Sequence, residues 1–277
     1  MALQPLTRSK VIRLAVPVML AQAATASTGV VDTAVMGLHG TEVDIGAVGI
    51  AVVTMTFLYW AFGFLRMSTT GLVAQAAGAD QHDEVSATLQ RALLTGAALG
   101  LAILLLSPLL KHLVFQPFAA TDEVKNLAGS YWNARIWGAP ALLISYAITG
   151  WLLGMGKTGQ LLVVQIIMNG VNCGLDIWFV AGLDLGPAGI GAGTAIGEWV
   201  SVIVGLYMVR SGLGRSPALF DKAKLIALFT ANRDILIRTL ALLFVFAWFV
   251  NSGASIDTAT LVIAGDDIRH PECLAHS

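Results

Sequence analysis

The sequence predicts an all-α integral membrane protein, built as a bundle of long apolar helices. Hydrophobic residues make up 56% of the 277 residues and charged residues only 12%, whereas a soluble domain carries about 25% charged residues. The mean hydropathy is +0.77. The apolar residues also gather in runs of about 20, which is the length that an α-helix needs to cross a bilayer. Both observations point to a protein whose main solvent is lipid.

Seven apolar runs are expected to cross the membrane, and short connections between them favour antiparallel neighbours. Six form one unit over residues 1–210, a basic connection follows over 211–233, and the seventh begins a second lobe over 234–260. The tail over 261–277 carries too many charged residues to continue a span. The predicted spans are 11–36, 46–77, 86–110, 129–153, 159–181, 188–210 and 234–252.

The basic residues predict the orientation of the chain. Arg8, Lys10 and Arg13 precede the first span, and six Lys or Arg residues lie between 210 and 238, while the loops around 40–44 and 182–186 contain none. Because cytoplasmic loops are enriched in Lys and Arg, we expect the N-terminus and the 211–233 connection in the cytoplasm. The net charge of −1 gives no indication of nucleic-acid binding. The five histidines and two cysteines show no metal-ligand spacing.

Two aspartates lie inside apolar runs, Asp32 in VVDTAVMG and Asp176 in NCGLDIWFV. A carboxylate at the centre of a membrane helix costs about 2.5–3.5 kcal/mol, so such residues face a protein interior or an aqueous cavity and often bind cations or protons. Burial disfavours the charged form of a carboxyl group, which favours proton uptake. Carboxylate, amide and hydroxyl oxygens also suit a hard cation such as Na⁺.

Other polar residues recur at helical spacing on four spans, so that each helix has one polar face. This pattern predicts a bundle around a wet or ion-binding cavity. We expect Thr25, Ser145 and Ser201 to serve only as interhelical hydrogen-bonding groups. The stripes are Gln22, Thr25, Gly29 and Asp32; Tyr131, Arg135, Gly138, Ser145 and Thr149; Gln165, Asn169, Asn172 and Asp176; and Thr194, Glu198, Ser201 and Gly205.

The glycine-rich run GPAGIGAGTAIGEW is not a nucleotide-binding loop, since its spacing is not GxGxxG and no strand precedes it. Its small residues recur every four positions and predict a ridge for close helix packing. The seven tryptophans are expected mostly at span ends and lipid faces. Pro17 and Pro140 lie within spans and permit kinks. Arg66 is expected either to reach the interface or to act as a counter-ion. The ridge consists of Gly189, Gly193, Gly197, Ser201 and Gly205.

Several segments, taken together and in order, resemble the multidrug and toxic compound extrusion transporters, in particular their bacterial DNA-damage-inducible branch. This resemblance covers roughly residues 7–250. The matching segments are LAVPVMLAQ, VVDTAVMGLHG, TTGLVAQAAGA, YWNARIWGAPA, GMGKTGQ, NGVNCGLDIWFV and GPAGIGAGTAIGEW.

The resemblance implies a six-helix N-lobe and an antiporter of the bacterial inner membrane. It implies export of cationic or amphipathic compounds in exchange for H⁺ or Na⁺, with no other cofactor or metal, and only lipid and small molecules as partners. It links a kink at Pro17 to protonation of the first-helix aspartate. The implied ion site contains Asp32, Asn172, Asp176, Thr194 and Tyr131, with Gln22, Gln165, Asn169, Glu198, Arg66 and Arg135 as secondary polar contacts.

Two other interpretations follow from the residues. Family members have two lobes and this sequence stops after its seventh run, so a truncated remnant that binds a cation without transport is one alternative. A membrane-embedded aspartyl enzyme is a second, but it requires Tyr-Asp and Gly-x-Gly-Asp, where this chain has Val31-Asp32 and Gly174-Leu175-Asp176. We therefore expect no enzymatic activity. A cleaved signal peptide ending near Ala23 is disfavoured because the apolar run continues to Met36.

Overall fold

The computed structural model describes residues 8–116, 120–214, 233, 237, 238 and 241. Within these residues it consists of helices, six of whose continuous stretches are long and apolar enough to cross a membrane. The predicted seventh span, the polar tail and most of the basic connection lie outside the described residues. The candidate spans are Val11–His39, Glu42–Gly78, His82–Phe115, Asp122–Gly154, Thr158–Gly182 and Gly186–Gly212.

Two of the six spans are divided, which the apolar pattern did not predict. The second consists of α2 and α3, joined by a turn over 61–63, and the fourth consists of α5 and α6, joined by a 3₁₀ turn at Ile136–Gly138 directly before Pro140. Pro lacks the backbone N–H that an unbroken helix needs at this point. The α-helices are α1 Arg8–His39, α2 Glu42–Trp60, α3 Phe64–Gly78, α4 His82–Phe115, α5 Asp122–Arg135, α6 Ala139–Gly154, α7 Thr158–Ile177 and α8 Gly186–Val209.

Polar side chains fix where two of the helices begin. The Thr41 hydroxyl accepts from the backbone N–H of Asp44, whose carboxylate accepts from the Thr41 backbone in return, so α2 begins with a capping box. Thr121 caps α5 by accepting from the Val124 N–H. Such caps satisfy backbone donors that have no partner inside the helix.

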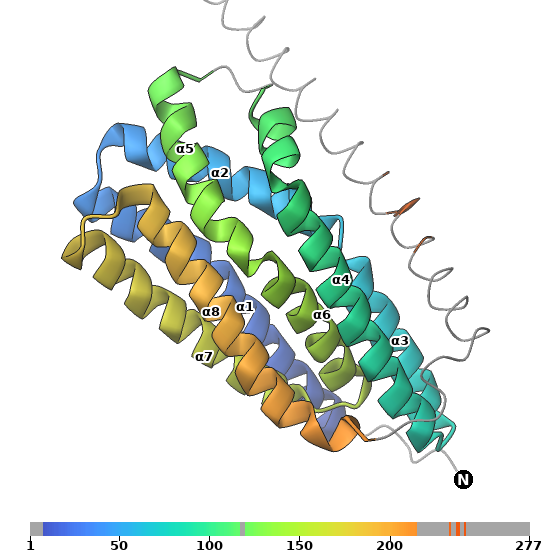
Figure 1. Ribbon diagram of the computed structural model, residues 1–277. Coiled ribbons are helices and arrows are strands. Elements are labelled where there is room, and N and C mark those ends of the chain that lie inside the picture. The colour runs from blue at the N-terminus through green and yellow to red at the C-terminus, as the bar shows by residue number, and fades with distance from the viewer. Residues whose placement is uncertain (1–7, 117–119, 215–232, 234–236, 239–240, 242–277) are drawn as a thin grey trace, which may run out of the picture.

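The helices pack as one bundle with α6 and α8 near its middle. In Figure 1, α6 lies between α8 on one side and α3 and α4 on the other, while α7 packs against the far side of α8 and α1 packs against α7. The side chains that point outward are apolar, including Val30, Leu105 and Ile203, each at least two-thirds exposed. An apolar outer surface around a bundle with its backbone groups bonded internally suits a lipid environment.

The predicted small-residue ridge is confirmed as the surface on which α8 meets its neighbours. A Cβ atom at Gly193 would collide with Asp176, one at Gly197 would crowd Asn172, and one at Gly205 would lie 2.9 Å from Ile148. The ridge therefore brings the backbone of α8 against the polar face of α7 and against α6.

The tryptophans divide between the surface and the core. Trp60, Trp137, Trp178 and Trp199 are 42–64% exposed, as expected for an interfacial belt. Trp132 and Trp151 are instead fully buried and contribute to the two apolar clusters of the bundle, and the Trp132 indole donates to Ser107 at 2.9 Å. Trp248 lies outside the described residues.

Candidate functional site

Four residues expected in an ion site meet between α1, α7 and α8. Asp32 is 4% exposed, Asn172 2% and Asp176 0%. The Asn172 amide donates to Asp176 Oδ2 at 2.9 Å and to Thr194 Oγ1 at 3.1 Å, and Thr194 donates to the carbonyl of Ile190. The amide of Asn172 thus joins the α7 carboxylate to the α8 hydroxyl inside the bundle.

The carboxyl groups of Asp32 and Asp176 interact with each other, although they belong to different helices. An ionised carboxylate only accepts hydrogen bonds, so a bond between two of them requires a proton on one. This geometry suits the binding of a proton, or of a small cation that both carboxylates contact.

Three buried oxygen atoms in this cluster have no hydrogen-bond partner among the described residues: Asp32 Oδ1, Asp176 Oδ1 and Asn172 Oδ1. Unpartnered buried polar atoms are rare and call for an explanation such as an ion. Two carboxylates, an amide oxygen and the nearby Thr194 hydroxyl are hard oxygen ligands of the kind that alkali and alkaline-earth cations prefer. The donor set therefore fits either a proton or Na⁺.

A short π-helical turn, Trp178–Gly182, begins two residues after Asp176. Single π turns inside helices often accompany functional sites, because they change the direction of the side chains before them. The α8 backbone also lies so close to Asp176 that a Cβ atom at Gly193 would collide with Asp176 Oδ1. Asp176 is therefore held between its own helix and a glycine of α8.

The first half of the α7 stripe contacts α1 directly. Thr28 donates to Asn169 Oδ1 at 3.0 Å, and the Thr25 hydroxyl lies 3.5 Å from Gln165 Oε1 and 3.0 Å from the carbonyl oxygen of Ala21 in its own helix. The predicted interhelical role of Thr25 is confirmed, as is that of Ser145 and Ser201, whose hydroxyls lie 3.2 Å apart. Gln165 and Asn169 thus hold α1 against α7 next to the ion cluster.

Arg135 and Glu198, both expected as secondary contacts, form a bidentate ion pair between α5 and α8. The two guanidinium nitrogens donate to the two carboxylate oxygens at 2.6 and 2.5 Å. The guanidinium also lies 5.2 Å from the ring centre of Tyr59 and acts electrostatically on both Asp32 and Asp176. Sequence reasoning missed Tyr59, since an aromatic residue in an apolar run carries no signal of this contact.

A cavity of about 500 Å³ opens above these groups. Asp32, Tyr131, Arg135, Thr194 and Glu198 line its polar part, and Tyr131 is only 3% exposed. The apolar part is lined by Val52, Met55, Trp60, Leu142 and Met168. A cavity with an apolar wall and a few converging polar groups is typical of small-molecule sites.

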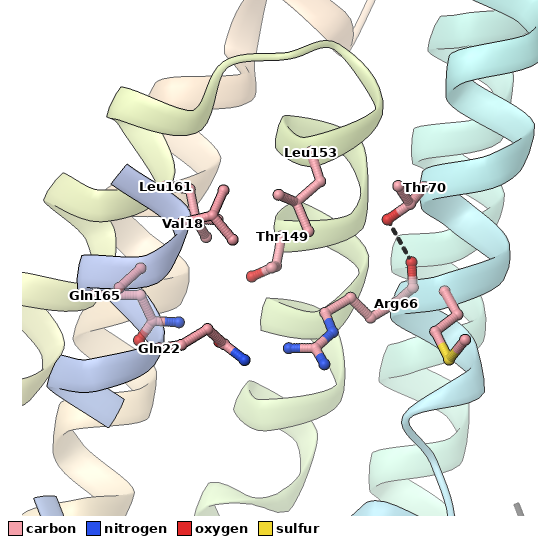
Figure 2. A pocket seen from close by; sticks show the side chains of 10 residues that line it. Val18, Gln22, Arg66, Thr70, Thr149, Leu153, Leu161 and Gln165 are labelled. Carbon is pink, nitrogen blue, oxygen red and sulfur yellow. Dashed lines mark hydrogen bonds between the residues drawn. The ribbon is translucent and has the colours of Figure 1, made fainter. Parts of the chain in front are cut away.

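Gln22 and Arg66 lie farther along the bundle, at a second pocket that Figure 2 shows, with Gln165 beside them. Gln22 lines both cavities, whereas Arg66 lines only the second. Pro17 lies within α1, which continues through it to His39. Its 15-residue separation from Asp32 corresponds to about 22 Å of helix.

Comparison with known proteins places the site in a family context. The MatE family model matches residues 17–178. DNA damage-inducible protein F of Escherichia coli strain K12 is 32% identical over 259 residues, which cover 90% of this chain and 56% of that protein. The probable multidrug resistance protein NorM of Acinetobacter baylyi is 27% identical over 74% of this chain and 46% of its own length.

Solved structures show the same fold. A MOP superfamily transporter from Pyrococcus furiosus, which is described as having a binding pocket of reverse polarity, superposes with a TM-score of 0.76 at 20% identity, over 92% of this chain and 59% of that one. The Vibrio cholerae MATE transporter VcmN in its bent form gives 0.69 at 18% identity, over 92% and 57%. The chain spans about half the length of the curated relatives it matches.

Proposed function

This chain belongs to the MatE family, and from that premise we propose that it forms the cation-binding lobe of a secondary active efflux transporter. In this proposal Asp32, Asn172, Asp176 and Thr194 bind the coupling ion. The observation that carries it is the buried cluster itself, in which two carboxyl groups from different helices interact and three oxygen atoms have no partner among the described residues.

The coupling ion is proposed to be a proton, with Na⁺ as the second candidate. The close approach of two carboxyl groups favours a proton, because one must be protonated for them to bond. The amide and hydroxyl oxygens favour Na⁺. Either ion neutralises charge between α1 and α7, and an ion that binds one of two bundle arrangements more tightly shifts their populations.

The transported compounds are proposed to be cationic or amphipathic molecules that enter the 500 Å³ cavity. Its polar floor carries more carboxylates than cations, with Asp32 and Glu198 against Arg135. Its apolar wall suits the body of such a compound. A substrate cation and the coupling ion would then compete for the same carboxylates, which is the requirement for exchange.

The protein is proposed to lie in the bacterial inner membrane with its N-terminus in the cytoplasm. The start of α1, the α3–α4 and α6–α7 connections and the end of α8 share one end of the bundle (Figure 1). Arg8, Arg13, Lys157 and Arg210 lie at this end, and cytoplasmic ends are enriched in such residues.

Cation binding can be tested on the purified chain in phosphatidylcholine nanodiscs. The midpoint of thermal unfolding is measured across a pH series with NaCl or choline chloride at constant ionic strength. A ligand at one hundred times its Kd adds about 2.7 kcal/mol to the free energy of unfolding. We expect Na⁺ or protons to raise the midpoint in the parent and not in Asp32→Asn or Asp176→Asn.

Asp184→Asn is the matched control, because it removes the same charge from an exposed loop and Asn tolerates the positive φ of 53° found there. It should retain the full ion-dependent shift. An unchanged shift in both site variants would contradict the proposed cation site.

Transport is tested separately, because a lobe that binds a cation without exporting anything is the second candidate function. Ethidium efflux is measured in a strain lacking its own exporters, for the chain alone and for the chain joined to the second half of its Escherichia coli relative. Alternating access requires two halves, so we expect export only from the joined protein and its loss in the Asp32→Asn form. Cation binding without export from either protein would favour the second candidate.

A further inference from the structure

A second pocket, of about 390 Å³, lies between α1, α3, α6 and α7. Figure 2 shows Arg66 reaching from α3 into this space, toward Gln22 on α1, with the Thr149 hydroxyl of α6 beside it. Val18, Leu153 and Leu161 form an apolar wall. The pocket therefore combines the positive charge of Arg66 with an apolar wall.

The charge of Arg66 has no carboxylate to balance it. No Asp or Glu is among the described residues that line this pocket, and the two ion pairs found in the described part of the chain involve Arg91 and Arg135. Arg66 contacts the Tyr146 ring, with its guanidinium carbon 5.9 Å from the ring centre. A guanidinium keeps its proton under all ordinary conditions, and an unpaired charge inside a membrane segment indicates a function.

The neighbouring side chains can add hydrogen-bond donors, because each Gln amide carries two N–H groups. The amide oxygen of Gln165 lies 3.5 Å from the Thr25 hydroxyl, and its N–H groups have no acceptor among the described residues. The Gln22 amide and the Thr149 hydroxyl face the same space (Figure 2). A guanidinium with two further amides around it is a set of donors that suits a carboxylate, sulfonate or phosphate.

We propose that this pocket binds the acid group of an amphipathic organic anion, with Arg66 as its charge partner. The acid group lies between Arg66, Gln22 and Gln165, and the apolar body of the anion contacts Val18, Leu153 and Leu161. The chemistry is opposite to that of the cation cavity above it. The inference goes beyond the proposed coupling site and does not require transport, since it concerns binding alone.

Two dyes that share an aromatic body and differ in charge test this proposal. 1-Anilinonaphthalene-8-sulfonate carries a sulfonate, and N-phenyl-1-naphthylamine carries no charge. Their fluorescence is titrated with the full chain in phosphatidylcholine nanodiscs, after subtraction of the signal from protein-free nanodiscs. We expect the sulfonate dye to bind about tenfold more tightly than the neutral dye. A hydrogen bond to a charged group contributes enough binding free energy to account for a difference of this size.

Variants then assign the charge selectivity to Arg66. Arg66→Gln should weaken binding of the sulfonate dye about tenfold and leave the neutral dye within about twofold, while Arg66→Lys keeps most of the selectivity. Arg210→Gln removes an exposed cation that lies over the Tyr207 ring, away from this pocket, so it should change the affinity for neither dye. The comparison of the two dyes on the parent chain remains informative if Arg66→Gln does not fold.

Equal affinity of the parent for both dyes would overturn the proposal. An equal loss of affinity for both dyes in Arg66→Gln would also overturn it, because that result would indicate an apolar site without charge selectivity. Replacing part of the phosphatidylcholine with phosphatidylglycerol distinguishes the sources of the anion. Competition by this lipid identifies a lipid head group as an occupant, whereas unchanged affinity for the sulfonate dye assigns the pocket to free amphipathic anions.

Discussion

Arg135 of α5 donates to both carboxylate oxygens of Glu198 of α8, and less than a tenth of either side chain is exposed. This pair lies at the floor of the cation cavity, beside Asp32 and Thr194. The excess negative charge in the cavity lining therefore comes from Asp32, because Glu198 is already balanced by Arg135.

Glu198→Gln should destabilise the bundle strongly, since it leaves the Arg135 charge buried and unpaired. Removing one partner of a buried ion pair costs about 3–5 kcal/mol. The midpoint of thermal unfolding in detergent measures this loss. Glu84→Gln is the matched control, and it should cost less because Glu84, paired with Arg91, is 17% exposed. Replacing both residues together, as Arg135→Met with Glu198→Leu, should recover most of the stability. An unfolding midpoint equal to that of the parent for Glu198→Gln alone would contradict the expected cost of leaving Arg135 unpaired.

Gly193→Ala should displace Asp176, because its new methyl group would collide with Asp176 Oδ1. Overpacking of this kind costs about 1–3 kcal/mol, and the ion-dependent shift of the unfolding midpoint should disappear. Gly174→Ala, two residues from Asp176 on α7, meets nothing within 4 Å. It should stabilise the helix by about 0.5–1 kcal/mol and keep the shift. Equal behaviour of the two variants would mean that Asp176 is not confined by α8.

Thr194→Val should weaken cation binding while the fold survives. Val keeps the shape of Thr but removes the oxygen that accepts from Asn172, at a cost of about 1 kcal/mol in stability. The ion concentration at half-maximal stabilisation is the measured quantity, and we expect it to rise. Thr33→Val serves as the comparison, since that exposed hydroxyl donates to Gly29 of its own helix. A rise of the same size in Thr33→Val would remove Thr194 from the site.

The Ser145–Ser201 hydrogen bond should contribute little, in contrast to the ion pair one turn away on α8. Interhelical hydrogen bonds in membrane bundles average about 0.6 kcal/mol in double-mutant cycles. A cycle of Ser145→Ala, Ser201→Ala and the double variant, followed by equilibrium unfolding, gives the coupling directly. A coupling above about 2 kcal/mol would exceed the largest such values measured, about 1.7 kcal/mol, and would indicate a role beyond packing.

The six described spans could be predicted from the sequence, because apolar runs and polar stripes report directly on burial in lipid and in the bundle. The break at 61–63 could not, since hydropathy does not record a turn inside an apolar run. Pro140 indicated a kink near the second break, at Ile136–Gly138, but not that the helix would be interrupted there. Gly138 was a further signal, because a Cβ there would collide with Glu198, but this contact exists only once the helices are packed.

The polar faces predicted the candidate site better than they predicted its internal pairing. Helical spacing places Asn172 and Asp176 on one face, and they bond as neighbours. The same spacing cannot show that Arg135 pairs with Glu198, because the axial shift between two helices depends on their packing. It also could not show that Arg66 lies apart from the ion cluster. A polar stripe shows which face of its own helix a residue lies on, but not which residue of a neighbouring helix it contacts. The ion-binding role of the cluster stays a prediction.

The helix that carries Asp32 meets the described bundle along one side. Only 6% of the most apolar stretch of α1 is buried inside the lobe, against 22% for the span formed by α7 and 67% for the span formed by α5 and α6. The polar contacts of α1 with its neighbours are concentrated on the side that meets α7, where Thr28 donates to Asn169. An ion held between Asp32 and Asp176 would therefore act directly on this α1–α7 contact.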